Sequence, residues 1–105
     1  MKKIFLLNTI LIFKLFASNN SVDCIILEDE DSIVCKYIHT RVSYDHNISV
    51  KWIDPNKNIS RQRDMTIPAF HGSIYDYRYI KGRMQGVWTF EVIDNNTSYK
   101  TNFKL

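Results

Sequence analysis

The sequence predicts an all-β protein in which about seven short antiparallel strands form a two-layered sandwich after an N-terminal signal peptide. Segments of alternating apolar and polar residues recur at a spacing of about 8–12 residues. Turn-forming residues separate these segments, and no apolar stripe with helical spacing occurs after residue 17. With 105 residues, the chain has the length of one domain.

The start of the chain has the composition of a secretory signal peptide. Two lysines precede an apolar run from Ile4 to Phe13, and Ala17 and Ser18 supply small residues for cleavage. The run is shorter than the roughly 20 residues that span a bilayer, so leader removal would leave no stable membrane span. An uncleaved amphipathic anchor is the alternative. We expect a periplasmic or secreted protein with a signal peptide at 1–17, a short linker at 18–21 and a β-sandwich domain at 22–105.

Export would change the charge of the chain. The net charge is +3, and Lys2, Lys3 and Lys14 all lie in or beside the apolar leader, so the mature chain is close to neutral (3 − 3). This near-neutrality argues against a general affinity for polyanions, and an exported protein does not meet nucleic acid.

The first two strands are expected at 22–28 and 32–40, and each carries one cysteine. If Asp29 and Glu30 form the hairpin tip, Glu28 faces Asp31 and Cys24 faces Cys35. Opposed side chains lie about 4.5–5.5 Å apart at Cβ, which is close to the reach of a disulfide. Paired cysteines in exported chains are normally oxidised, so we predict a Cys24–Cys35 disulfide.

The middle of the chain predicts three more strands. In the segment 48–54, Ile48, Val50 and Trp52 share one face, and "PNKN" then supplies a turn. The segment 59–67 has charges on both faces, which is typical of an edge strand.

In the segment 73–80, the tyrosines point one way and Ile74, Asp76, Arg78 and Ile80 the other. We expect the tyrosines to pack in the core and Asp76 and Glu91 to be outward-facing strand charges rather than a catalytic carboxylate pair.

The last two strands are expected on either side of "DNNT", because the apolar alternation continues to Leu105. The pattern Gly86-x-Trp88-x-Phe90-x-Val92, followed by Phe103-x-Leu105, resembles the closing hairpin of small immunoglobulin-like or fibronectin-III-like modules in exported bacterial proteins. Trp52 with "DPN" is similar to the middle strand and turn of such modules. The resemblance implies an immunoglobulin-like sandwich and by itself no activity. It departs from antibody-type domains, because Cys24 and Cys35 are too close in sequence for an inter-sheet disulfide.

The sequence gives no indication of catalysis. It contains no GxSxG, HExxH or glycine-rich phosphate loop. His39, His46 and His71, with Asp45 or Asp64, do not have the spacing of a compact metal site. We therefore expect no enzyme activity and no cofactor.

The segment "YDYRYIKGR" interleaves aromatic and basic residues, a combination favoured at binding surfaces. The function we expect is an exported binding or accessory module that makes protein–protein contacts. The alternative is a small periplasmic inhibitor or carbohydrate-binding protein that uses a tyrosine and arginine surface, so the partner is an unknown protein or glycan. Buried tyrosines favour the first, and exposed tyrosines favour a ligand platform. The candidate surface residues are Arg61, Arg63, Tyr75, Tyr77, Arg78, Tyr79, Lys81 and Arg83.

Asn47 and Asn96 are candidate glycosylation sites. Each begins an N-x-S/T sequence and follows an Asp two positions earlier, which resembles the extended acceptor of bacterial N-glycosylation systems. We expect both in exposed loops.

Overall fold

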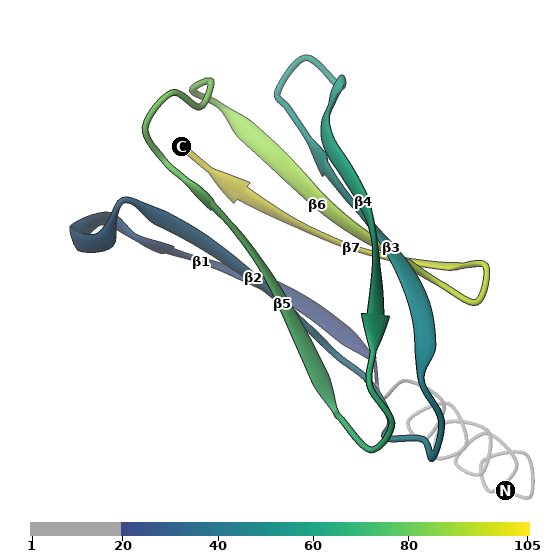
Figure 1. Ribbon diagram of the computed structural model, residues 1–105. Helices are drawn as coiled ribbons and strands as arrows, with labels where there is room; N and C mark the ends of the chain where they lie inside the picture. The colour runs from purple at the N-terminus through teal and green to yellow at the C-terminus, as the bar shows by residue number, and fades with distance from the viewer. Residues whose placement is uncertain (1–19) are drawn as a thin grey trace, which may run out of the picture.

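The computed structural model describes residues 20–105 as a sandwich of two antiparallel sheets (Figure 1). The seven predicted strands are confirmed: β1 (Ser21–Leu27), β2 (Ser32–Ile38), β3 (His46–Ile53), β4 (Ile59–Ile67), β5 (Ser73–Tyr79), β6 (Val87–Asp94) and β7 (Thr97–Lys104). The predicted signal peptide at 1–17 lies outside the described residues. Within residues 20–105, no helix has the length and apolar character needed to cross a membrane.

The strands divide between the sheets in a defined order. The smaller sheet has the order β1-β2-β5, and the larger has the order β4-β3-β6-β7. The fourth strand is an edge strand, as predicted, and it pairs with β3. In constant-type immunoglobulin domains the fourth strand belongs instead to the sheet of the first strand. As a result, β4 and β5 are edge strands of opposite sheets and lie along the same side of the sandwich (Figure 1).

Aromatic side chains from the larger sheet fill the core. Trp52 and Trp88 are both buried, as their apolar alternation predicts. The Trp52 ring meets Phe90 edge-on at a centroid distance of 5.1 Å, and Trp88 stacks on Phe103 at 6.1 Å. The indole N–H of Trp88 donates to the Met84 carbonyl at 2.8 Å. Each ring therefore combines a large buried apolar area with a paired N–H group.

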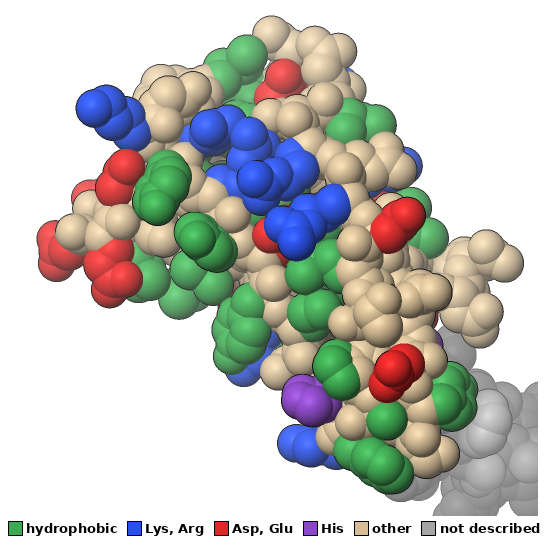
Figure 2. Space-filling view, viewed as in Figure 1, with side chains coloured by type: hydrophobic (Ala, Val, Ile, Leu, Met, Phe, Trp, Pro, Cys, Tyr) green, Lys and Arg blue, Asp and Glu red, His purple; other side chains and the backbone are tan. Residues whose placement is uncertain are grey.

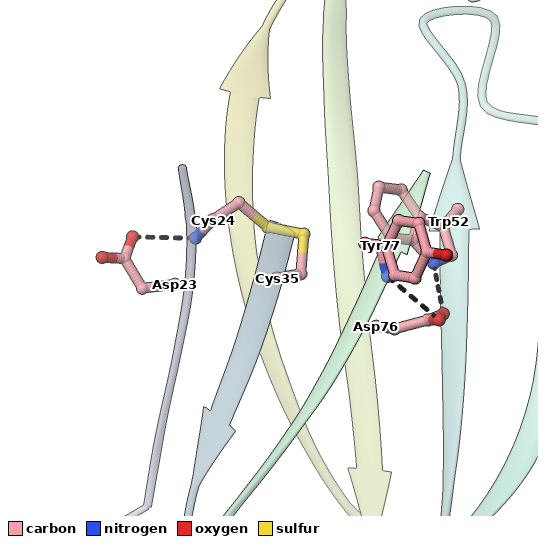
Figure 3. The surroundings of a disulfide bond; sticks show 6 residues. All are labelled: Asp23, Cys24, Cys35, Trp52, Asp76 and Tyr77. Carbon is pink, nitrogen blue, oxygen red and sulfur yellow. Dashed lines mark hydrogen bonds between the residues drawn. A yellow bond between two sulfur atoms is a disulfide. The ribbon is translucent and has the colours of Figure 1, made fainter. Parts of the chain in front are cut away.

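The first hairpin has the predicted register and disulfide. Cys24 lies directly opposite Cys35 in the β1–β2 ladder, with 4.1 Å between their Cα atoms, and the two are bonded (Figure 3). The predicted two-residue tip is wrong, because strand pairing ends one step earlier, at Leu27 and Ser32. Residues Glu28–Glu30 form a turn of 3₁₀ helix, η1, and Asp31 adopts a left-handed conformation with φ of 52°.

Asp31 turns inward and holds the loop after β5. Its carbonyl accepts the backbone N–H of Ile80 at 3.0 Å, and its carboxylate accepts that of Lys81 at 2.9 Å. The Asp31 N–H also donates to the Glu28 carbonyl at 3.1 Å, which closes the 3₁₀ turn, so the two residues are joined by a turn and not by a strand pair.

The closing hairpin extends to the last residue. Gly86 and Leu105 exchange two backbone hydrogen bonds of 2.9 Å. Gly86 has φ of 129°, and a Cβ atom there would lie 2.9 Å from the Pro55 ring, so this position requires glycine. The glycine and the "DPN" turn of the sequence pattern are thus in contact.

Candidate binding surface

The fifth strand has the opposite orientation to the one predicted. Tyr75, Tyr77 and Tyr79 are 54%, 56% and 59% exposed, whereas Asp76 is buried. Neighbouring strands place opposed residues on the same face, and β2 pairs Cys35 with Asp76. Because Ile33, Cys35 and Tyr37 of β2 point into the core, the residues of β5 opposite them must do so too. The apolar alternation of β2 is visible in the sequence and indicates which of its residues point into the core. Together with the pairing of β2 and β5, it would have predicted that the tyrosines are exposed.

The tyrosines belong to a wider apolar surface on the outer face of the β1-β2-β5 sheet. The ladder places Tyr77 in one row with Val34 and Ile25, and Tyr79 in a row with Leu27. We call these residues, together with Tyr75, the tyrosine face: Ile25, Leu27, Val34, Tyr75, Tyr77 and Tyr79. Ile25 is 53% exposed, so aliphatic and aromatic groups are presented together. At one end of the face, the ammonium group of Lys36 lies 5.4 Å from the centre of the Tyr75 ring.

Asp76 is an internal acceptor rather than an outward-facing charge. Its Oδ2 atom accepts the indole N–H of Trp52 at 2.8 Å, and its Oδ1 atom accepts the backbone N–H of Tyr77 at 3.1 Å (Figure 3). Arg63 donates to the same Oδ1 atom at 3.3 Å. Glu91 lies on β6 in the other sheet, where it accepts the Ser98 hydroxyl, so these carboxylates form no pair.

The arginines gather beside the tyrosine face in a cleft between the edge strands β4 and β5. The cleft has a volume of about 250 Å³, and we call it the arginine cleft. It is lined by Arg61, Arg63, Asp76, Tyr77, Arg78, Tyr79 and Arg83. Figure 2 shows these basic side chains as one cluster, with apolar side chains next to it. Six of the eight predicted surface residues meet here, while Tyr75 and Lys81 lie outside the cleft.

The cleft has an excess of positive charge. Its four arginines face a single carboxylate, that of Asp76, which lies 3.6 Å from Arg61 and 3.3 Å from Arg63. Burial lowers the pKa of Arg78 below its usual value, and the nearby charges of Arg83 and Arg61 lower it further. Both causes disfavour the cationic form of Arg78, whereas the charge of a bound anion would favour it.

The arginines also connect the two sheets. Arg61 of β4 donates to the Tyr77 carbonyl at 3.3 Å, and Arg78 of β5 donates to the Ser60 hydroxyl at 2.9 Å. Arg83 donates to the Tyr79 carbonyl at 3.1 Å. Two carbonyl groups of the β5 edge are therefore already paired with side chains, which hinders the addition of another strand at this edge.

The acidic residues of the first hairpin lie at the same end of the molecule. Glu28, Asp29 and Glu30, which we call the acidic tip, are all exposed. Ser32, which follows the tip and Asp31, pairs with Tyr79, so the tip and the arginine cleft flank the same end of the tyrosine face. In Figure 2, apolar side chains lie between the acidic groups at the left and the main basic cluster, and one further basic side chain lies beside the acidic groups.

The histidines lie elsewhere. The rings of His39 and His46 are 4.8 Å apart in a polar pocket of about 460 Å³ at the other end of the sandwich. The Asp94 carboxylate accepts the Tyr37 hydroxyl at 2.7 Å and lies 3.5 Å from His46. Burial, with this hydrogen bond, raises the pKa of Tyr37. Within residues 20–105, no three His, Cys, Asp or Glu side chains form a metal-binding group.

The two candidate glycosylation sites have different surroundings. Asn96 lies in the two-residue β6–β7 turn, with φ of 66°, and is exposed. Asn47, expected in a loop, lies instead in β3, where it pairs with Thr66 and accepts its hydroxyl at 2.7 Å.

No protein-family model and no curated protein matches this chain.

Proposed function

We propose that the chain is an exported, non-catalytic binding module that contacts a protein partner through the tyrosine face. All three tyrosines are more than half exposed, which is the outcome expected for a ligand platform and not for a partner bound at a sheet edge. The observation that carries a protein as the occupant of this platform is the aliphatic side chains that lie beside the tyrosines on the same sheet face. Tyrosine and arginine are enriched where proteins bind one another, and a contiguous apolar patch is costly to leave in water. The arginine cleft, at the edge of the face, would receive acidic groups of the partner.

The geometry of the face favours a protein over a glycan. A sugar ring stacks on a flat aromatic surface, but the Tyr77 and Tyr79 rings meet at 84°, with 6.2 Å between their centroids. Ile25 and Val34 extend the surface with aliphatic groups, which suit apolar side chains of a partner better than sugar hydroxyls. Because two carbonyl groups of the β5 edge are occupied by arginines, the contact uses the face of the sheet rather than its edge.

Export is supported by the Cys24–Cys35 disulfide, since such bonds persist in oxidising compartments. The leader-like composition of residues 1–17 supports it independently. In an exported protein, the tyrosine face would meet other periplasmic or secreted proteins.

Site-specific photo-crosslinking tests the proposal. A photoreactive phenylalanine analogue replaces Tyr77 in one variant and Tyr44 in a control, because Tyr44 is 62% exposed and lies outside the face. In cells that export the protein, we expect a protein adduct of discrete mass from position 77 and none from position 44. A protease-resistant, sugar-containing adduct would favour the glycan-binding alternative, and the absence of any adduct from position 77 would overturn the proposal.

A further inference from the structure

Acidic and basic groups lie on opposite borders of the tyrosine face. The acidic tip follows β1, at one border, while the arginine cleft adjoins β5, at the other. Both lie at the end of the sheet where Leu27, Ser32 and Tyr79 form a row. A surface with an apolar centre and opposite charges on its two borders is complementary to a rotated copy of itself.

We infer that the partner of the tyrosine face is a second copy of this chain, bound face to face about a two-fold axis. This inference rests on the proposed function, because it fills the same surface. The axis runs parallel to the strands and passes between β2 and β5. In this arrangement, β2 of each copy lies over β5 of the other copy. The acidic tip of each copy extends past β5 of the other copy, toward that copy's arginine cleft.

The rows of the ladder support this arrangement. A two-fold axis along the strands keeps each row at its own level, so Val34 of one copy meets the Tyr77 side chain of the other. Lys36 meets Tyr75 across the interface as it does within one chain, where the ammonium group lies 5.4 Å from the ring centre. The two acidic tips lie on opposite sides of the axis, and each faces arginines.

The size of the contact sets the expected strength. Two strands of seven residues form a strip about 23 Å long and about 10 Å wide, to which the charged borders add. The strip covers about 230 Å² on each copy, well below the roughly 800 Å² per partner of standard-size interfaces, so the contact belongs to the weak, transient class. The pair should therefore dissociate in the micromolar range or above, with an affinity that decreases as salt is added.

Sedimentation velocity of the purified, disulfide-bonded protein tests the inference. Between about 1 µM and about 500 µM, we expect a shift from monomer to dimer, and Tyr77→Ser should weaken the association by about tenfold or more.

Two charge reversals test the orientation. One variant carries Glu28→Lys with Glu30→Lys, and the other carries Lys81→Glu with Arg83→Glu.

Each charge reversal alone should weaken self-association by about tenfold or more. In one homodimer, a tip that carries lysines faces arginines, and in the other, an acidic tip faces a border that has gained two carboxylates and lost its excess of positive charge. An equimolar mixture of the two variants should recover the affinity of the unaltered chain to within about threefold, since each tip then meets an opposite charge. Variants that merely misfold would show no recovery on mixing. A chain that stays monomeric across the whole range, or a mixture without recovery, overturns the inference. The Tyr77 photo-crosslink to a different protein would in that case leave the proposed function standing.

Discussion

Among single residues, Asp76 connects the core to the candidate binding surface. Its carboxylate accepts the indole N–H of buried Trp52 and also pairs with Arg63, which lines the cleft. A surface charge was the natural interpretation of an acidic residue in a strand, since carboxylates are rarely buried without partners. Its partners are distant in sequence: Trp52 lies 24 residues away and Arg63 lies 13 residues away. No local pattern could have identified them.

Replacement of Asp76 should therefore destabilise the fold. Asp76→Ala leaves the Trp52 N–H buried without its acceptor and removes the carboxylate that pairs with Arg61 and Arg63. We expect the free energy of unfolding in urea to decrease by about 2–4 kcal/mol. Asp64→Ala is the matched control, because Asp64 is exposed on β4, and it should change stability by less than about 0.5 kcal/mol. Equal effects of the two substitutions would show that the Asp76 contacts contribute nothing.

Among the strands, the sequence predicted pairings better than orientations. The apolar alternation of β3 and β6 and the spacing of the cysteines led to the correct register and core residues. The orientation of β5 was wrong because its two faces are similar in composition: tyrosines on one, and isoleucines with an arginine and an aspartate on the other. Only its pairing with β2, a contact between residues about 40 positions apart, determines which face is buried. The arginine cleft depends on the same long-range pairing.

The first hairpin gives a prediction about stability. Replacing Cys24 and Cys35 by alanine removes a cross-link between residues 11 apart, which should lower the free energy of unfolding by roughly 2–3 kcal/mol. The variant should still fold, because the β1–β2 ladder and the core contacts remain. Urea unfolding followed by tryptophan fluorescence measures the change. An unchanged urea midpoint would contradict a stabilising role, and thiol labelling of the unaltered denatured chain without reductant should detect no free thiol.

The positions of the two acceptor sequences predict unequal modification. A glycosyl-transferring enzyme needs the Asn in an accessible, deformable segment. Both Asn side chains are exposed, but Asn96 lies in a turn, whereas Asn47 is held in the β3–β4 ladder and is not in a deformable segment. When the folded chain is treated with a bacterial oligosaccharyltransferase, peptide mass spectrometry should find glycan on Asn96 alone. The reduced, denatured chain should accept it at both sites. Glycan on Asn47 of the folded chain would show that this part of β3 opens readily.

In the molecule as a whole, two sheets enclose one core and are held together by side chains from both. The larger sheet supplies most of the core, the disulfide fixes the first hairpin, and arginine side chains join the β4 and β5 edges. The outer face of the smaller sheet keeps its tyrosines in solvent. If the chain is exported and binds a protein as we propose, we expect this face to be covered by that protein in the cell.

Tyrosine reactivity in the exporting cell tests this expectation most directly. The rate of nitration of Tyr77 and Tyr79 is measured by peptide mass spectrometry in intact cells and in dilute purified protein, with exposed Tyr44 as the internal reference. A covered face predicts that, relative to Tyr44, Tyr77 and Tyr79 react several-fold more slowly in cells than in the dilute protein. Equal relative rates in the two settings would contradict the assignment of this face as a binding surface.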